Sequence, residues 1–193
     1  MRYWIMAVII PVALFLNGCG EDDGGEENTT TASGWHFQGR DCLACHNVDL
    51  GIDKHLVFGG TLFKSYNTTD TDDLNQVCDA DLAVEFLDNS WNVVYSTNSY
   101  YDENSKGNNG RGNIFLLDRL FNATLNGSYT VRIIERVSGR TMAQSRQASH
   151  SFSGGEYSID NPQNFSNRLS CNACHNGKTT DFLNASINAD LCK

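Results

Sequence analysis

The sequence is short of prolines and of basic residues, and each shortage excludes a class of protein. The 193 residues include only two prolines beside 17 glycines, which excludes a proline-rich or collagen-like chain. The 14 Lys and Arg stand against 23 Asp and Glu, a formal charge of −9. Nucleic acids and anionic membrane faces require a basic patch, so neither is expected as a partner. Hydrophobic residues make up 40% of the chain, enough for one sizeable core.

The longest apolar run lies at the amino terminus. Arg2 precedes an apolar stretch at residues 4–16, which has the length of a signal-peptide core and is short for a bilayer span. The following Leu16-Asn17-Gly18-Cys19 resembles the lipobox of bacterial lipoproteins, in which the cysteine is lipidated after cleavage. An ordinary cleavage site with an incidental cysteine is the alternative. The interpretation is that residues 1–18 are a lipoprotein signal peptide and that Cys19 carries a lipid anchor, so the mature chain is exported.

Residues 19–34 are acidic and glycine-rich and contain no large apolar side chain. Such a segment has nothing to bury, so it is expected to be a flexible tether behind the lipid anchor. Gly20 follows the lipidated cysteine, which by resemblance to Gram-negative lipoproteins favours the outer membrane.

Four of the seven cysteines form two copies of one motif. Each copy has the pattern Cys-x-x-Cys-His, the attachment pattern of c-type haem, at residues 42–46 and 171–175. The composition of the chain predicts only about 0.006 copies by chance. Two thiols at this spacing can reach the two vinyl groups of one porphyrin, and the adjacent histidine then lies beneath the iron. A thioredoxin-like redox pair and a four-cysteine zinc site are the alternatives, and neither needs a histidine after each pair.

On these motifs the chain resembles the multihaem c-type cytochromes, specifically a dihaem member. The resemblance implies two covalently bound c-type haems, attached through Cys42 and Cys45 and through Cys171 and Cys174. It further implies proximal iron ligands at His46 and His175, and electron transfer as the activity. Only 18 residues follow His175, too few for a Met-ligated cytochrome domain that begins at the second motif. The mature chain keeps one methionine, Met142, so two His/Met haems are excluded.

Three histidines outside the motifs are candidate distal ligands: His36, His55 and His150. Two bis-His haems need two of them, and the alternative for each is an ordinary surface histidine. His55 lies nine residues after His46, so a short loop could carry it over a haem face. The sequence does not tell which histidine faces which haem.

Cys78 and Cys192 remain after the two motifs and Cys19 are assigned. In an oxidising compartment a leftover pair is expected to form a disulfide, which here would tie the carboxyl-terminal tail to the middle of the chain. Two unpaired thiols are the alternative.

Between the motifs the pattern is that of a β domain. Short apolar runs alternate with turn residues, and no long stretch keeps a helical period. Strands are expected at 57–63, 82–86, 93–95, 114–117, 129–133, 141–144 and 150–152. Asn126-Gly127 and Ser138-Gly139 are expected to be turns, and residues 98–113 a long polar loop. The fold is therefore expected to be mainly β: a sandwich of about seven short antiparallel strands at 56–160, with haem-binding loops or short helices at 35–55 and 161–193.

Residues 112–116 followed by 127–131 resemble the carboxypeptidase regulatory-like (transthyretin-like) sandwich, which has a Gly-x-Tyr-x-Val strand in this order. The resemblance covers about 100 residues and implies a scaffold. The haems are then either close neighbours or at opposite ends of it.

Three possible functions follow from these residues. The first is electron transfer between periplasmic or cell-surface redox partners, cytochromes among them, possibly toward an extracellular acceptor. The alternative is a haem enzyme with one open iron that reduces a small molecule. A third is a subunit of a haem-bearing filament or complex, in which the surplus histidine ligates a neighbour's haem.

Overall fold

The computed structural model describes residues 35–100, 110–155, 157–160 and 169–193. The expected signal peptide, Cys19 and the tether lie outside these residues, as does most of the expected loop at 98–113. The described part is mainly β, as predicted, with seven strands in two antiparallel sheets and two short α-helices. Among these residues, no helix has the length and apolar character needed to cross a membrane.

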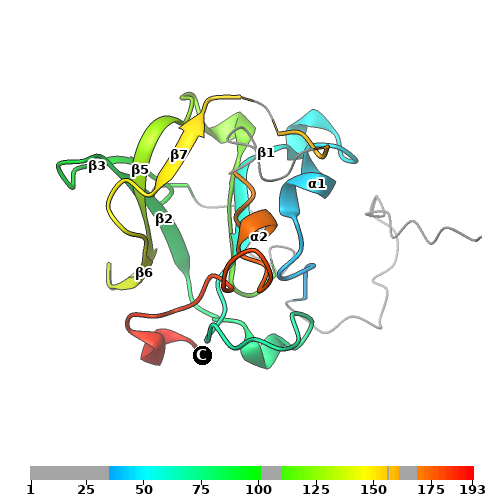
Figure 1. Ribbon diagram of the computed structural model, residues 1–193, viewed down its shortest axis with the longest axis vertical. Coiled ribbons are helices and arrows are strands. Elements are labelled where there is room, and N and C mark those ends of the chain that lie inside the picture. Colours follow the sequence, from blue (N-terminus) through cyan, green and yellow to red (C-terminus); the bar gives the residue numbers. More distant parts are fainter. Residues whose placement is uncertain (1–34, 101–109, 156, 161–168) are drawn as a thin grey trace, which may run out of the picture.

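The smaller sheet pairs β1 with β4, and the larger has the order β3-β2-β5-β6, with β7 paired to β5. Figure 1 shows the two motif helices beside β1 and the larger sheet on the other side of the molecule. The strands are β1 (Leu56–Thr61), β2 (Leu82–Leu87), β3 (Val93–Ser96), β4 (Asn113–Leu117), β5 (Asn126–Glu135), β6 (Thr141–Gln144) and β7 (His150–Ser153), and the helices are α1 (Cys42–His46) and α2 (Cys171–Cys174).

The core lies between the two sheets and is made of apolar side chains at alternate strand positions. Alternate residues point to the same face of a strand, so β2 contributes Val84 and Phe86 to it, and β1 contributes Phe58. Glu85, between the two β2 residues, lies opposite Arg132 on β5 and forms an ion pair with it at 2.7 Å. The other members include Leu62, Ile114, Leu116, Leu125, Ile133, Met142 and Phe152.

The expected strands agree with the structure except where β5 begins. Ser138-Gly139 turns the chain between β5 and β6, as predicted, and Gly139 has the positive φ that such turns favour. The prediction of a turn at Asn126-Gly127 was wrong. These two residues are the first of β5 and pair with Ser153 and Phe152 of β7. Pairing with a strand distant in sequence overrides the local turn preference here.

The carboxyl-terminal tail is joined to the sandwich, as predicted, by a disulfide between Cys78 and Cys192, whose Cα atoms are 4.6 Å apart. Before this bond the tail runs along the smaller sheet's end: Phe63 N donates to Leu183 O, and Ala185 N donates to Phe63 O, both at 2.8 Å. The second motif and the tail are thus parts of the packed structure.

Candidate functional site

Both motif helices pack against β1, at two consecutive glycines. A Cβ atom at Gly59 would lie 2.8 Å from the Cβ of Cys42, and a Cβ atom at Gly60 would lie 2.5 Å from the Cβ of Cys171. Real Cβ atoms do not approach so closely, so only glycine permits this packing. Successive residues of a strand face opposite sides, so the first cysteine of each motif contacts a different face of β1. The structure therefore brings the two motifs together.

The residues directly before each motif contact one another. Asp41 begins α1: its side chain accepts hydrogen bonds from the backbone N–H groups of Leu43 and Ala44, the usual N-cap arrangement. The same carboxylate accepts a hydrogen bond from the Ser170 hydroxyl, next to Cys171, and another from Tyr157 OH at 2.7 Å. One carboxylate therefore starts the first helix and holds the second motif beside it.

Each motif histidine is oriented by a backbone carbonyl. Nδ1 of His46 lies 2.9 Å from Lys54 O, and Nδ1 of His175 lies 3.0 Å from Asp181 O. A carbonyl only accepts, so Nδ1 must carry the proton in each ring. In the neutral form of each ring, Nε2 then keeps its lone pair, which is the arrangement of most metal-bound histidines.

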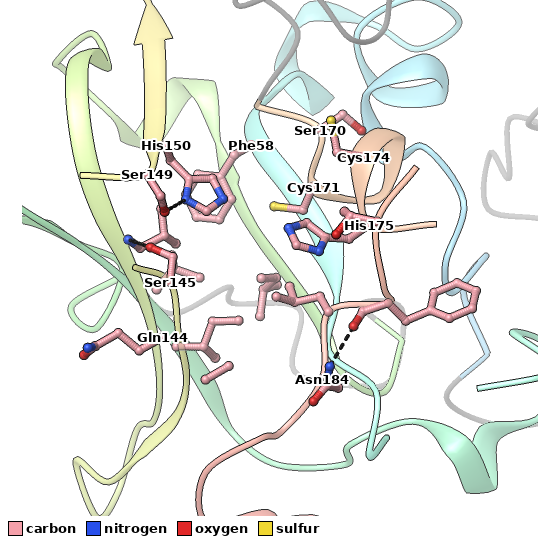
Figure 2. A pocket seen from close by; sticks show the side chains of 18 of the residues that line it. Phe58, Gln144, Ser145, Ser149, His150, Ser170, Cys171, Cys174, His175 and Asn184 are labelled. Carbon is pink, nitrogen blue, oxygen red and sulfur yellow. Dashed lines mark hydrogen bonds between the residues drawn. The ribbon is translucent and has the colours of Figure 1, made fainter. Parts of the chain in front are cut away.

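Each motif histidine faces one of the candidate distal histidines. The ring centres of His36 and His46 are 6.1 Å apart, with 50° between the ring planes. Those of His150 and His175 are 6.4 Å apart and nearly parallel, at 18°. Figure 2 shows the second pair across the cavity, with the Cys171 sulfur directed toward the space between the rings.

These spacings can be compared with what a metal between two imidazoles requires. A metal–nitrogen bond of about 2.0 Å and about 1.1 Å from a ring nitrogen to the ring centre place the two centres about 6.2 Å apart. Both observed separations lie within a few tenths of an ångström of this value. Direct stacking of the rings would bring them closer. Within the described residues, no group of three or more His, Cys, Asp or Glu gathers to hold a bare metal ion.

His55 is fixed by its backbone. It follows a single 3₁₀ turn, η1 (Ile52–Lys54), and directly precedes β1, and its carbonyl accepts a hydrogen bond from Asp118 N at 2.8 Å. The ring pairs that the structure brings together involve His36 and His150 instead. A ligand role for His55 stays a prediction.

The two histidine pairs have different surroundings. The second pair lines a cavity of about 490 Å³ between α2 and the larger sheet, within the range of small-molecule and cofactor sites. Its walls are mostly apolar and include Phe58, Val84, Phe86, Ile114, Ile133, Phe152 and Leu183. The first pair borders a smaller pocket of about 70 Å³, where Arg40 and Asp41 also lie. Burial lowers the pKa of His36, and the charge of His46 lowers it further, so His36 is held in the neutral form that binds metals.

Cys42, Cys171 and Cys174 carry free thiols. Burial raises the pKa of Cys42 to about 12, with smaller contributions from Cys171 and Asp41. Burial likewise raises the pKa of Cys171 to about 12. Both are protonated at neutral pH and weakly nucleophilic. Cys45 is disulfide-bonded in this structure.

Sequence reasoning missed the side chains that join the two motifs. Asn172, the first variable residue of the second motif, is 2% exposed and bonds to backbone atoms before the first motif. Asp41 and Ser170 were missed as well. The one signal in the sequence was that both Asp and Ser are common N-cap residues and each stands directly before a motif.

Comparison of the chain with models of protein families, with curated proteins and with solved structures finds no match.

Proposed function

We propose that this chain is a dihaem c-type cytochrome that carries electrons between redox proteins. Cys42 and Cys45 would hold one haem, with His46 and His36 on its iron. Cys171 and Cys174 would hold the other, with His175 and His150. The observation that carries the proposal is that each motif histidine has a second imidazole at the separation that one iron needs: 6.1 Å in one pair and 6.4 Å in the other.

The site favours electron transfer over the enzyme alternative. Bound haem would supply a one-electron Fe(III)/Fe(II) couple. Two histidines on each iron leave no position for oxygen, peroxide or another small substrate. The chain's own part is to orient the imidazoles, through Lys54 O and Asp181 O, and to surround the second site with apolar side chains that exclude water. The β-sandwich serves as the scaffold.

The proposed setting is the outer membrane, reached through export and lipidation of Cys19, with periplasmic or cell-surface cytochromes as partners. The net charge of −9 favours partners that present a basic face, because opposite charges steer encounter between proteins. Attachment at Cys45 requires its free thiol, so the mature protein is expected to lack the disulfide at that residue.

The test is absorption spectroscopy of the full chain, produced in a host that attaches haem c, with a pyridine haemochrome count and a carbon monoxide challenge. We expect two low-spin haems per chain and no change on adding carbon monoxide. The paired variants Cys42→Ala/Cys45→Ala and Cys171→Ala/Cys174→Ala should each keep one haem. A protein without covalent haem would overturn the proposal, and a high-spin haem that binds carbon monoxide would favour the enzyme.

A further inference from the structure

The residues directly before the second motif run along the edge of β1 that does not pair with β4. One edge of β1 pairs with β4. On the other edge, Gly59 N donates to Leu169 O at 3.1 Å, and Gly59 forms a parallel bridge with Ser170. Thr61 N is the next donor along this edge, since alternate residues of a strand bond to the same side. The chain has by then turned into α2, so its backbone no longer supplies the acceptor.

The side chain of Asn172 supplies the acceptor for Thr61 N that the backbone no longer provides. Its Oδ1 accepts from Thr61 N at 3.0 Å. Its Nδ2 donates to Arg40 O at 2.7 Å, two residues before Cys42, and to Thr61 Oγ1 at 3.2 Å. The residue is 2% exposed, so any group left without a partner there would be buried. One amide thus links the second motif to β1 and to the backbone that leads into the first motif.

The same bonds extend to the segment that carries His36. Thr61 Oγ1 donates to Asn113 Oδ1 at 2.7 Å, and Asn113 Nδ2 donates to His36 O at 3.0 Å. Thr61 is fully buried. The position of His36 is therefore connected, bond by bond, to Asn172 in the other motif.

The packing on β1 limits the distance between the two attachment points. Gly59 and Gly60 are consecutive, and each is in contact with one motif cysteine. Because neighbouring Cα atoms are about 3.8 Å apart, the Cβ atoms of Cys42 and Cys171 are within about 12 Å of each other. The two attachment points therefore lie close to one strand, on its two faces.

We infer that Asn172 is a positioning residue that fixes the two haem motifs as one unit, and that the two haems consequently interact directly as an intramolecular pair. The inference rests on the proposed function and adds to it the relation between the two sites. The hydrogen bonds of the Asn172 side chain go to Arg40 and Thr61, with a longer contact of 3.9 Å from Nδ2 to Cys42 Sγ, and none goes to a proposed iron ligand. Asn172 therefore acts by holding the two attachment segments and the His36 segment at fixed positions.

The first test is electron paramagnetic resonance of the fully oxidised wild-type protein. Two low-spin ferric irons that lie close together broaden and split each other's signals, and the effect disappears when one haem is reduced. The matched controls are the two single-haem proteins, Cys42→Ala/Cys45→Ala and Cys171→Ala/Cys174→Ala. We expect a diferric spectrum that differs from the sum of the two single-haem spectra. A spectrum equal to that sum would overturn the inference.

The second test assigns the effect to Asn172. The Asn172→Leu substitution gives the second motif the sequence Cys-Leu-Ala-Cys-His, identical to the first, so haem attachment itself has a precedent in this chain. We expect two low-spin haems with a weakened magnetic interaction. The control is Asn176→Ala, because the side chain of Asn176 hydrogen-bonds within the second segment, to Ala173, Lys178 and Thr179. Equal interaction in the wild type and Asn172→Leu would contradict a positioning role.

A gentler variant covers the case in which Asn172→Leu does not fold. Thr61→Val keeps the shape of the side chain and removes the hydroxyl that joins Asn172 to Asn113. The magnetic interaction between its two haems should also weaken. An unchanged interaction would contradict a role for the hydrogen bonds from Asn172 through Thr61 to Asn113. The outcomes separate the two claims: absence of haem refutes the proposed function, whereas two bis-His haems without interaction refute only the pairing.

Discussion

The backbone of His36 is held by hydrogen bonds to Gln38, nearby in the sequence, and to Asn113, on β4. Its backbone N–H donates to Gln38 Oε1 at 2.9 Å, and its carbonyl accepts from Asn113. Trp35 and Phe37 pack against each other with ring centres 4.5 Å apart. Phe37 has a φ of +50°, uncommon for a bulky side chain and maintained only where surrounding contacts demand it. These constraints together aim the imidazole at His46.

Under the proposed function, removing His36 or His150 should differ in its result from removing His55. His36→Ala and His150→Ala are each expected to open one iron, giving one high-spin haem and one bound carbon monoxide per chain. His55→Ala is the matched variant and should leave both haems low-spin. Optical titration with carbon monoxide measures the stoichiometry. Carbon monoxide binding by His55→Ala, with none by His36→Ala, would reverse the assignment.

Tyr157 makes stability depend on pH at the alkaline end. Partial burial raises the pKa of its hydroxyl, and the hydrogen bond to Asp41 and the charge of Asp41 raise it further. The protonated form is thus favoured in the folded state, so its contribution is complete below the unfolded pKa of about 10 and is lost as the pH rises through the folded pKa.

The Tyr157→Phe variant should be less stable by about 1 kcal/mol at neutral pH, because one partly exposed hydrogen bond to a carboxylate is lost. Above about pH 10 the gap between wild type and variant should narrow. Guanidinium unfolding curves at neutral pH and above about pH 10 measure the difference in stability between wild type and variant. A gap that widens with pH would mean that the hydroxyl does not donate to Asp41.

At the scale of elements, β1 is the strand that organises the site. It pairs with β4 on one edge and with the segment before α2 on the other, and its two faces contact the two motif cysteines. The adjacent pair Gly59-Gly60 makes both approaches possible, because neither position has a side chain.

The Gly60→Ala substitution should displace α2, since the added methyl would lie 2.5 Å from the Cβ of Cys171. We expect reduced loading of the second haem with the first retained, measured by haemochrome and by mass spectrometry of the haem-bearing peptides. Gly51→Ala is the matched control, because its methyl meets only the Asp53 carboxylate, an exposed side chain that can move. Equal loading in both variants would show that the close approach is not needed.

The strands and the two motifs could be predicted from sequence because alternation and Cys-x-x-Cys-His spacing are local signals. The contact between the motifs could not be predicted, because the hydrogen bond between Asp41 and Ser170, which precede the two motifs, joins residues 129 positions apart. The turn predicted at Asn126-Gly127 was wrong for the same reason, because the residues of β7 that pair with it lie far along the chain. The sequence left open which of the three histidines lies near His46, and the structure places His36 there, after a positive φ at Phe37.

At the scale of the whole molecule, the tail is part of the second site's wall. Leu183 and Asn184 line the cavity, and the disulfide at Cys192 fixes the tail beyond them. Ile187 N also donates to Met142 O at 2.9 Å, which links the tail to β6. Closure of the cavity therefore depends on the chain end.

The double variant Cys78→Ser/Cys192→Ser should lose about 4 kcal/mol of stability, because the cross-link closes a loop with a sequence separation of 114 residues. Guanidinium unfolding followed by far-ultraviolet circular dichroism measures the loss. Dithiothreitol provides an independent control, since it reduces a disulfide and leaves thioether bonds intact. The wild type with dithiothreitol should match the variant, and an unchanged midpoint in both would contradict the expectation.

The hydrogen bond between Thr61 and Asn172 also determines when, during synthesis, the site can be completed. The two residues are 111 positions apart, and the amino-terminal partner is synthesised first. The edge of β1 that meets the second motif stays incomplete until the last segment is present. Once packed, Cys42 and Cys171 are protonated and poorly reactive. If haem is attached as proposed, its attachment would have to precede this packing, and a chain that folded early would close its own sites before they were filled.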